Sequence, residues 1–276
     1  MPITNSHPFL SIITPSLNQG KYLEEAIQSV KIQNYPAYEH IIVDGGSQDE
    51  TLAILEKYAN DPSLRWISEP DYGQSNALNK GFQMAKGDFI GWLNADDRYA
   101  PGCFHIVSVF LQSHPEVDVV YGDYCFIDKL GKTISLRLEI DFDPFILRFL
   151  HVLYIPSTAT FFRRRIFDNG HYLREDFHYA MDYEFFLRLS LQGYKFAHIR
   201  QHLADFRWHG LNKSSLAPHK QWQEQERALQ ELDPLFSKIK NPIQYKILRY
   251  LFLNLARAKR TWLKLLRGSY WRKLCP

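Results

Sequence analysis

The chain has 276 residues, of which 45% are hydrophobic and 15% aromatic, so it can bury a substantial globular core. This composition excludes a disordered chain, and no stretch reaches the ~18 uninterrupted apolar residues that a membrane-spanning helix requires. The net charge of +3 is unevenly distributed, because residues 236–276 contain eleven Lys or Arg and no Asp or Glu. The preceding residues therefore carry a net charge of −8, and the basic C-terminal segment needs its own explanation.

Cysteine content and the first residues bear on the cellular compartment. Cys103, Cys125 and Cys275 are widely spaced and form neither a disulfide framework nor a zinc-binding pattern. Residues 1–8 lack the charged and apolar regions of a signal peptide. Both observations predict a cytoplasmic protein in a reducing environment.

Strand and helix patterns alternate along the first hundred residues. Short apolar, β-branched segments predict strands, and the periodic segments between them predict helices. The expected strands are residues 9–14, 40–43, 64–67 and 89–93, and the expected helices are residues 20–30, a segment carrying Leu52, Leu55 and Tyr58, and residues 73–85. Repeated units of this kind predict a mainly parallel sheet with helices on both faces.

The pattern is less regular after Asp97. The sequence predicts a helix at 101–113, strands within 117–127 that Gly122 and Asp123 interrupt, an apolar strand at 156–162, a helix at 182–191 and a strand at 194–199. Beyond Pro218 the chain is expected to be entirely helical.

Polar groups follow each of the first four predicted strands. They are Thr14-Pro15-Ser16, Asp44-Gly45-Gly46-Ser47, Ser68-Glu69-Pro70-Asp71 and Asn94-Ala95-Asp96-Asp97. In α/β proteins ligands bind outside the carboxyl ends of the strands, and oxygen ligands suit Mg²⁺ or Mn²⁺ together with a phosphate. An ordinary solvated turn is the alternative for the acidic segment.

In their order and spacing these segments resemble the inverting family 2 glycosyltransferases, which use nucleotide-diphospho-sugar donors. The matching segments are residues 13–18, 42–51, 79–81, 93–97 and 180–184, within a stretch from about residue 9 to about residue 209. The resemblance implies a GT-A-type, Rossmann-like, mainly parallel sheet flanked by helices. It places the catalytic domain at 1–215 and leaves a helical, basic, amphipathic extension at 216–276.

The resemblance also implies a nucleotide-sugar site. In the family, the residue at the position of Asp44 contacts the base. Many members carry a second Asp where this chain has Gly45, so the role of that carboxylate is missing here. The expected nucleotide-sugar-binding residues are Thr14, Pro15, Ser16, Asn18, Asp44, Gly46, Ser47, Gln74, Asn79, Asn94, Ala95 and Asp96. For the hydroxyls of the first segment, helix capping is the alternative.

A divalent metal is implied by the next motif. Asn94-Ala95-Asp96 aligns with the Asp-X-Asp motif of the family, with Asn in place of the first Asp. Asp96 is thereby expected to bind Mg²⁺ or Mn²⁺ on the diphosphate, and His209 is the expected second metal ligand. A packed or surface role is the alternative for His209, and Asp97 is either a supporting partner or a cap.

Asp182 precedes a helical segment and corresponds to the catalytic base of the resembled family. Inverting transfer needs a carboxylate that takes the proton of the acceptor hydroxyl. A helix cap is the alternative for Asp182, and Glu184 is the next candidate for the base.

The basic C-terminal segment has helical periodicity. Ile247, Leu251, Leu255, Trp262 and Leu266 fall on one face, and most basic residues lie broadly opposite. This pattern predicts that residues 243–267 bind a membrane surface, with packing on the catalytic domain as the alternative. Nucleic acid is not an expected partner, because no recognition module accompanies the charge.

The sequence therefore predicts an inverting glycosyltransferase that moves a sugar from a nucleotide-diphospho-sugar to a saccharide or lipid-linked saccharide in polysaccharide or glycolipid synthesis. It is expected in the cytoplasm, peripheral on the inner face of the membrane. The alternative is an inactive glycosyltransferase-like binding or scaffold module, which Asn94 and Gly45 favour. A nucleotidyltransferase is less well supported, because residues 14–20 lack a glycine-rich basic loop.

Overall fold

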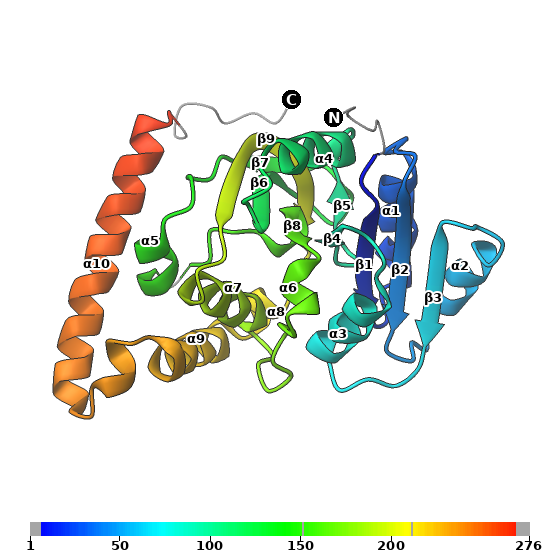
Figure 1. Ribbon diagram of the computed structural model, residues 1–276. Helices are drawn as coiled ribbons and strands as arrows, with labels where there is room; N and C mark the ends of the chain where they lie inside the picture. The colour runs from blue at the N-terminus through cyan, green and yellow to red at the C-terminus, as the bar shows by residue number, and fades with distance from the viewer. Residues whose placement is uncertain (1–6, 151, 211, 269–276) are drawn as a thin grey trace.

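The computed structural model describes residues 7–150, 152–210 and 212–268. The first six residues of the predicted catalytic domain and the last eight of the predicted extension lie outside the described residues. A single nine-stranded sheet runs through the centre of the molecule, with helices on both of its faces (Figure 1). The predicted α/β class is confirmed.

The strands of this sheet follow the order β3-β2-β1-β4-β8-β6-β9-β5, and β7 pairs with β6. They are β1 (Leu10–Ser16), β2 (Tyr38–Asp44), β3 (Leu64–Ser68), β4 (Phe89–Trp92), β5 (Arg98–Tyr99), β6 (Val119–Ile127), β7 (Thr133–Arg137), β8 (Thr160–Arg163) and β9 (Phe196–Arg207). The first four strands are mutually parallel, so their carboxyl ends meet at one edge. β8 is antiparallel to both of its neighbours, and β9 is parallel to β6.

The helices surround this sheet. They are α1 (Gly20–Lys31), α2 (Thr51–Lys57), α3 (Gln74–Met84), α4 (Cys103–Ser113), α5 (Pro144–Phe149), α6 (Arg165–Asp168), α7 (Met181–Leu191), α8 (Lys213–Leu216), α9 (Pro218–Leu232) and α10 (Pro242–Leu266), with 3₁₀ turns η1 (Ser157–Ala159) and η2 (Phe236–Lys238).

Alternation along the strands separates two cores. Ile13 of β1 packs into the core that contains α3 and α7, whereas Leu10 and Ile12 pack into the core beneath α1 and α4. This is the period-two geometry of a strand that is buried on both faces. Gly81 allows α3 to approach β1 closely, because a Cβ at this position would lie 2.2 Å from Cγ2 of Ile13.

Several elements differ from the sequence prediction. The strand expected at 156–162 is the turn η1 followed by β8, which begins only at Thr160, and β5, β7 and α5 were not predicted. The strand expected at 194–199 continues to Arg207, because the polar residues that follow Ile199 hide its extension from a hydropathy pattern. The strands expected within 117–127 form one strand, β6, whose register against β9 shifts at Gly122 and Asp123. The longer β9 brings Arg207 to the carboxyl edge of the sheet.

The C-terminal helices pack on the sheet domain. Ala228 and Leu229 of α9 and Ala256 of α10 belong to the same core as the sheet residues. Phe252 of α10 stacks on Phe149 of α5 at a centroid distance of 4.7 Å. Among the described residues, no helix is long and apolar enough to cross a membrane.

The cysteines differ in state. Cys103 is a buried free thiol, whereas Cys125 is disulfide-bonded, so the expectation that the cysteines form no disulfide is wrong for Cys125. Cys125 lies close to His202 and Asp205, and the three could form a set of metal ligands. The disulfide, however, leaves Cys125 without a thiolate to bind a metal. The predicted reducing compartment stays a prediction.

Candidate active site

A cavity of about 570 Å³ lies at the carboxyl ends of β1 and β4, a volume that suits a small-molecule ligand. Its wall is built by the end of β1, the loops after β3, β4 and β9, and the start of α7. The predicted site residues that line it are Pro15, Ser16, Gln74, Asn94, Ala95, Asp96, Asp182 and His209. Segments far apart in the sequence therefore converge where an α/β sheet binds ligands.

Ser16 offers an unused polar group to this cavity. Its hydroxyl is buried and has no hydrogen-bond partner among the residues that the structure describes. A buried hydroxyl without a partner is unfavourable in the absence of a ligand. This orphan group therefore indicates that a polar ligand binds beside the end of β1.

Asp96 and His209 form a pair at the cavity wall. Oδ2 of Asp96 lies 2.9 Å from Nε2 of His209, and the imidazole ring stacks on Tyr22 at a centroid distance of 5.3 Å. Mg²⁺–oxygen distances of about 2.0–2.1 Å place neighbouring octahedral ligands about 2.9 Å apart. The two groups share a hydrogen bond in this structure, and their spacing is that of two adjacent ligands around a divalent cation, whose other positions would be left for ligand oxygens and water.

Asn94, which replaces the first carboxylate of the motif, holds its neighbours together. Its Oδ1 accepts hydrogen bonds from Trp92 Nε1 at 2.8 Å and from Gln74 Nε2 at 2.9 Å, and its Nδ2 donates to Asp97 Oδ2 at 3.0 Å. An Asp at position 94 would place its carboxylate about 3.0 Å from the carboxylate of Asp97. The amide avoids this repulsion.

Asp97 is a buried support for the loop and lies outside the cavity wall. It accepts hydrogen bonds from the backbone N–H of Arg207 at 2.8 Å and from the hydroxyl of Thr158. Burial and the nearby charge of Asp96 raise the pKa of Asp97, while these hydrogen bonds oppose the rise. Of the two roles open to Asp97, the supporting role agrees with this geometry.

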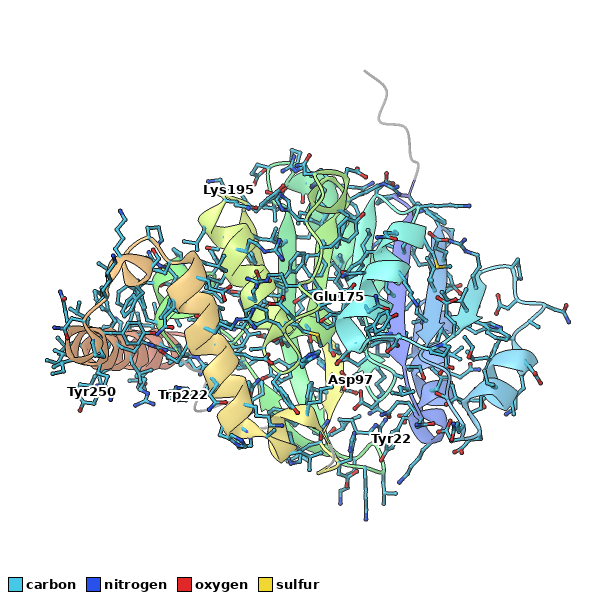
Figure 2. The ribbon with its side chains drawn as sticks, turned by 90° about the horizontal axis from the view of Figure 1, so that it is seen from below. Tyr22, Asp97, Glu175, Lys195, Trp222 and Tyr250 are labelled. Carbon is cyan, nitrogen blue, oxygen red and sulfur yellow. The ribbon has the colours of Figure 1, made fainter. Side chains whose placement is uncertain are left out.

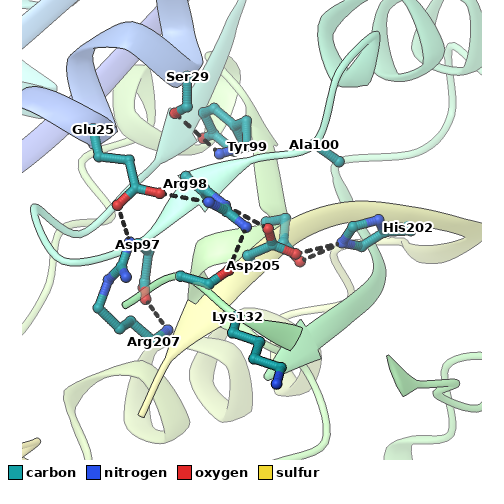
Figure 3. Close-up of polar contacts among 12 residues, drawn as sticks. Glu25, Ser29, Asp97, Arg98, Tyr99, Ala100, Lys132, His202, Asp205 and Arg207 are labelled. Atoms are coloured by element: carbon teal, nitrogen blue, oxygen red, sulfur yellow. Dashed lines mark hydrogen bonds and ion pairs between the residues drawn. The ribbon is translucent and has the colours of Figure 1, made fainter. Parts of the chain in front are cut away.

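Arg207 connects the loop after β4 to β9 and α1 (Figure 3). Its Nε donates to the carbonyl of Asp96 at 2.8 Å, and its Nη2 pairs with Glu25. Glu25 also pairs with Arg98, which binds Asp205 through Nε at 2.6 Å. Because Arg207 is only 1% exposed, this network fixes the backbone that carries Asp96.

Asp182 is not the N-cap residue of α7. The N-cap residue of this helix is Ala180, and the N–H groups of His178, Tyr179 and Ala180 donate to the carboxylate of Glu224 from α9 at 2.7–3.0 Å. Asp182 is thus not the N-cap residue, although its carboxylate accepts a hydrogen bond from the first-turn N–H of Tyr183 at 2.8 Å, and the residue also lines the cavity.

The surroundings of Asp182 favour a proton acceptor. Burial raises the pKa of Asp182 to about 6, and the charge of Glu224 adds to the rise, while a hydrogen bond from Tyr183 N and the charge of Lys213 oppose it. A carboxylate with this pKa is ionised at neutral pH and is more basic than a surface Asp. Glu184, the other candidate, is fully buried and paired with Arg188 at 2.7 Å, away from the cavity.

Six predicted nucleotide-binding residues lie behind the cavity wall, and they are Thr14, Asn18, Asp44, Gly46, Ser47 and Asn79. Thr14 lies on the same face of β1 as Ser16 but one pleat deeper in the sheet, where its buried hydroxyl bonds to His40 Nε2 at 2.9 Å. Asn79 joins α3 to the loop before α7 through the backbone of Leu173, at 2.9 and 3.0 Å.

Asp44 organises the loop that follows β2. Its Oδ2 accepts hydrogen bonds from the N–H groups of Gly46 and Ser47 at 3.1 and 2.9 Å and from the hydroxyl of Ser68 at 2.7 Å. Asn18 ties this loop to the end of β1, because its N–H donates to Ser47 Oγ at 2.7 Å. In this structure these side chains shape the cavity from behind and do not line it.

Several cavity residues were not predicted. Lys213 supplies a cation, and Asp71, His178, Tyr179 and Gln221 also line the wall. Desolvation lowers the pKa of Lys213, whereas the charges of Glu224, Asp71 and Asp182 oppose this change. Asp71 ends a polar segment that the sequence highlighted, but nothing in the sequence placed α9 or Lys213 beside the other loops.

The chain belongs to glycosyl transferase family 2, whose family model matches residues 11–170, more than half of its length. Chondroitin synthase of Escherichia coli is 30% identical over 208 residues, which are 75% of this chain and 30% of that protein. The chain spans only 19–61% of the length of the curated relatives that it matches.

Two groups of solved structures share the fold. TarS of S. aureus in complex with UDP-GlcNAc is 21% identical with a TM-score of 0.65, over 83% of this chain and 68% of that one. Mannosyltransferase PcManGT from Pyrobaculum calidifontis in complex with GDP-Man and Mn²⁺ is 17% identical with a TM-score of 0.61, over 94% and 75%. The predicted GT-A-type fold is thereby confirmed.

Proposed function

We propose that the protein is an inverting glycosyltransferase that moves a sugar from a nucleotide-diphospho-sugar to a saccharide or lipid-linked saccharide. The observation that carries the proposal is that the Asp96–His209 pair and Asp182 line one cavity, although they come from three separate segments. A metal ligand and a general base beside one substrate space suit group transfer from a diphosphate.

The charges of the cavity support a divalent cation. The carboxylates of Asp71, Asp96 and Asp182 line the wall, against the single lysine Lys213. A diphosphate would be repelled by this set unless a cation bridged it to the protein. Asp96 and His209 would hold Mg²⁺ or Mn²⁺, which offsets the negative charge of the leaving diphosphate when bound.

Asp182 would remove the proton of the acceptor. The acceptor oxygen forms a bond to the anomeric carbon while its proton passes to the Asp182 carboxylate. The bond between the anomeric carbon and the diphosphate oxygen breaks, and its electron pair leaves with the nucleoside diphosphate. Attack from the side opposite to the leaving group inverts the configuration.

The structural neighbours support a nucleotide-sugar donor, since their complexes contain UDP, UDP-GlcNAc or GDP-Man. We place the protein in the cytoplasm at the inner face of a membrane, where a lipid-linked saccharide acceptor would be found. An inactive binding module is the competing function, and Asn94 and Gly45 are the departures from the family pattern that favour it.

Release of the nucleoside diphosphate tests the proposal. Purified protein is incubated with a panel of UDP- and GDP-sugars, with Mn²⁺ or with a chelator, and free UDP or GDP is measured. An active enzyme releases nucleoside diphosphate from at least one donor, and release depends on Mn²⁺ and on Asp182. Tight donor binding without any turnover would instead indicate the binding module.

A further inference from the structure

Helix α10 exposes its apolar face to solvent. The predicted apolar residues Ile247, Leu251, Leu255, Trp262 and Leu266 are 51–66% exposed. Ile243, Tyr250 and Leu265 are also exposed, and Tyr250 lies on the outside of the molecule in Figure 2. At ~100° per residue these eight side chains fall within about half of the helix circumference. We define them as the outer face of α10.

The basic residues of α10 instead attach it to the sheet domain. Arg249 pairs with Glu226 at 2.7 Å, Arg260 and Lys264 pair with Glu139 at 2.9 and 3.0 Å, and Arg267 pairs with Asp123 at 2.6 Å. The helix therefore packs on the domain, as one alternative expected, through an inner side that combines these basic residues with apolar ones such as Phe252 and Ala256. A surface helix ordinarily buries its apolar stripe, so an exposed stripe of this length indicates a partner.

Charge indicates the nature of that partner. Lys246 and Arg257 are exposed along one margin of the outer face, and residues 236–276 contain no Asp or Glu. Exposed Trp262 and Tyr250 are of the kind that lies at the boundary between water and lipid. We propose that the outer face of α10 inserts into the headgroup region of an anionic membrane, with Lys246 and Arg257 on lipid phosphates or carboxylates.

Vesicle co-sedimentation tests this proposal. The full chain is mixed with phosphatidylcholine vesicles with or without phosphatidylserine, and Ile247→Ser/Leu251→Ser/Leu255→Ser is compared with wild type. We expect binding to the anionic vesicles, at least about tenfold weaker for the triple variant. The melting temperature should not fall, because these side chains point away from the domain.

A matched control removes the same kind of side chain elsewhere. Val109→Ser/Leu130→Ser/Ile134→Ser changes three exposed apolar residues, at 50%, 82% and 55% exposure, and should bind vesicles like wild type. Equal losses in both triple variants, or no binding of wild type to anionic vesicles, would overturn the proposal. The proposal would also be overturned if light scattering showed that the wild type is a dimer and that only the α10 triple variant is a monomer. The outer face of α10 would then bind a second copy of the chain.

Asp71 supports a second inference, which rests on the proposed nucleotide donor. A Cβ at Gly45 would lie 2.5 Å from Oδ2 of Asp71 and 3.0 Å from its Cγ. The Asp71 carboxylate thus fills the space into which a side chain at position 45 would project. A carboxylate from the loop after β3 therefore lies beside position 45, where the chain has Gly in place of the second Asp of the family.

Asp71 is better placed than Asp44 to meet a ligand. Its Oδ1 accepts a hydrogen bond from Gly73 N at 2.7 Å, which fixes the side chain, and the residue lines the cavity. Asp44 has four hydrogen bonds to its own loop and Ser68, and it lies behind the wall.

The position of Asp71 suits the base of the nucleotide. β2 and β3 lie two and three strands from β4, or about 10–15 Å at a spacing of ~4.8 Å. This is about the length of a nucleoside diphosphate whose phosphates lie at Asp96. We infer that Asp71 accepts a hydrogen bond from a ring N–H of the base, such as N3–H of uracil or N1–H of guanine.

Titration calorimetry with UDP and GDP, and with N3-methyl-UDP and N1-methyl-GDP, tests this inference. Wild type should bind the unmethylated form of its preferred nucleotide at least about tenfold more tightly than the methylated form. Asp71→Asn, whose Oδ1 can still accept from Gly73 N, should weaken binding of the unmethylated form by a similar factor. Glu69→Gln, which alters an exposed carboxylate nearby, is the matched control and should bind normally.

A double variant tests whether a carboxylate at position 45 can replace the carboxylate of Asp71. Gly45→Asp alone is expected to clash with Asp71, whereas Gly45→Asp/Asp71→Ala should restore most of the affinity that Asp71→Ala loses. Normal binding by Asp71→Asn, or failure of the double variant to recover affinity while it stays folded, would refute the role of Asp71. Failure of wild type to bind either nucleotide would refute the donor itself and this inference with it.

Discussion

Replacing Asp182 with Asn should raise stability and lower turnover. The folded protein holds the pKa of Asp182 at about 6, above the ordinary value of 3.8, because burial disfavours the charged form. Between these two values the unfolded chain loses its proton first, so rising pH destabilises the folded state. Since one pKa unit is worth about 1.4 kcal/mol, the penalty at neutral pH is about 3 kcal/mol.

Asp182→Asn removes this penalty and keeps an acceptor for the N–H of Tyr183. Near pH 7.5 the variant should melt several degrees above wild type, at about 2–4 °C per kcal/mol, and the difference should fade toward about pH 4. Donor turnover should fall at least about a hundredfold, and turnover of wild type should decline as the pH falls through about 6. Thermal melts at both pH values and nucleoside diphosphate release measure the two effects.

Glu184→Gln is the matched control for this pair of effects. Its carboxylate is fully buried and paired with Arg188, so the substitution should destabilise the protein by about 3–5 kcal/mol without removing the base. Wild-type turnover in Asp182→Asn, or a loss of stability in that variant near neutral pH, would refute the assignment of Asp182 as a partly buried, functional carboxylate.

Three further predictions concern the metal pair, the altered motif and the packing of α3. Asp96→Ala should abolish the dependence of donor binding on Mn²⁺ and reduce turnover; full activity of this variant in a chelator would exclude the metal role. Asn94→Asp should place a second carboxylate about 3.0 Å from that of Asp97, so its melting temperature should drop below wild type at neutral pH and recover in acid. Gly81→Ala should cost about 1–3 kcal/mol, because its Cβ would overlap Ile13, and an unchanged denaturation midpoint would show that α3 can shift.

The sequence predicted the parallel half of the fold well, because β1, β2 and β4 are buried on both faces and alternate with periodic helices. It predicted which face of α10 is apolar but not the direction in which that face points. The direction depends on ion pairs with Glu139 and Asp123 and on the packing of Phe252 against Phe149, and all three partners are distant in the sequence. Local periodicity carries no information about such contacts.

At the site, the sequence identified residues that the structure brings together, including Ser16, Asp96 and Asp182. It did not separate side chains that line the cavity from those that hold loops behind it, as Asp44 does. Both kinds of Asp occur at strand ends and look alike in a sequence. The sequence also did not predict that the Asp71 carboxylate lies beside Gly45, because this contact depends on the close approach of the loops after β2 and β3.

A crystal structure with UDP or GDP and Mn²⁺, with anomalous scattering recorded at the manganese edge, tests the proposed site most directly. We expect a manganese peak bound by Asp96 and the diphosphate, with His209 as a further ligand and the carboxylate of Asp182 facing the sugar position. A nucleotide bound outside this cavity, or manganese at a site without Asp96, would contradict the proposed site.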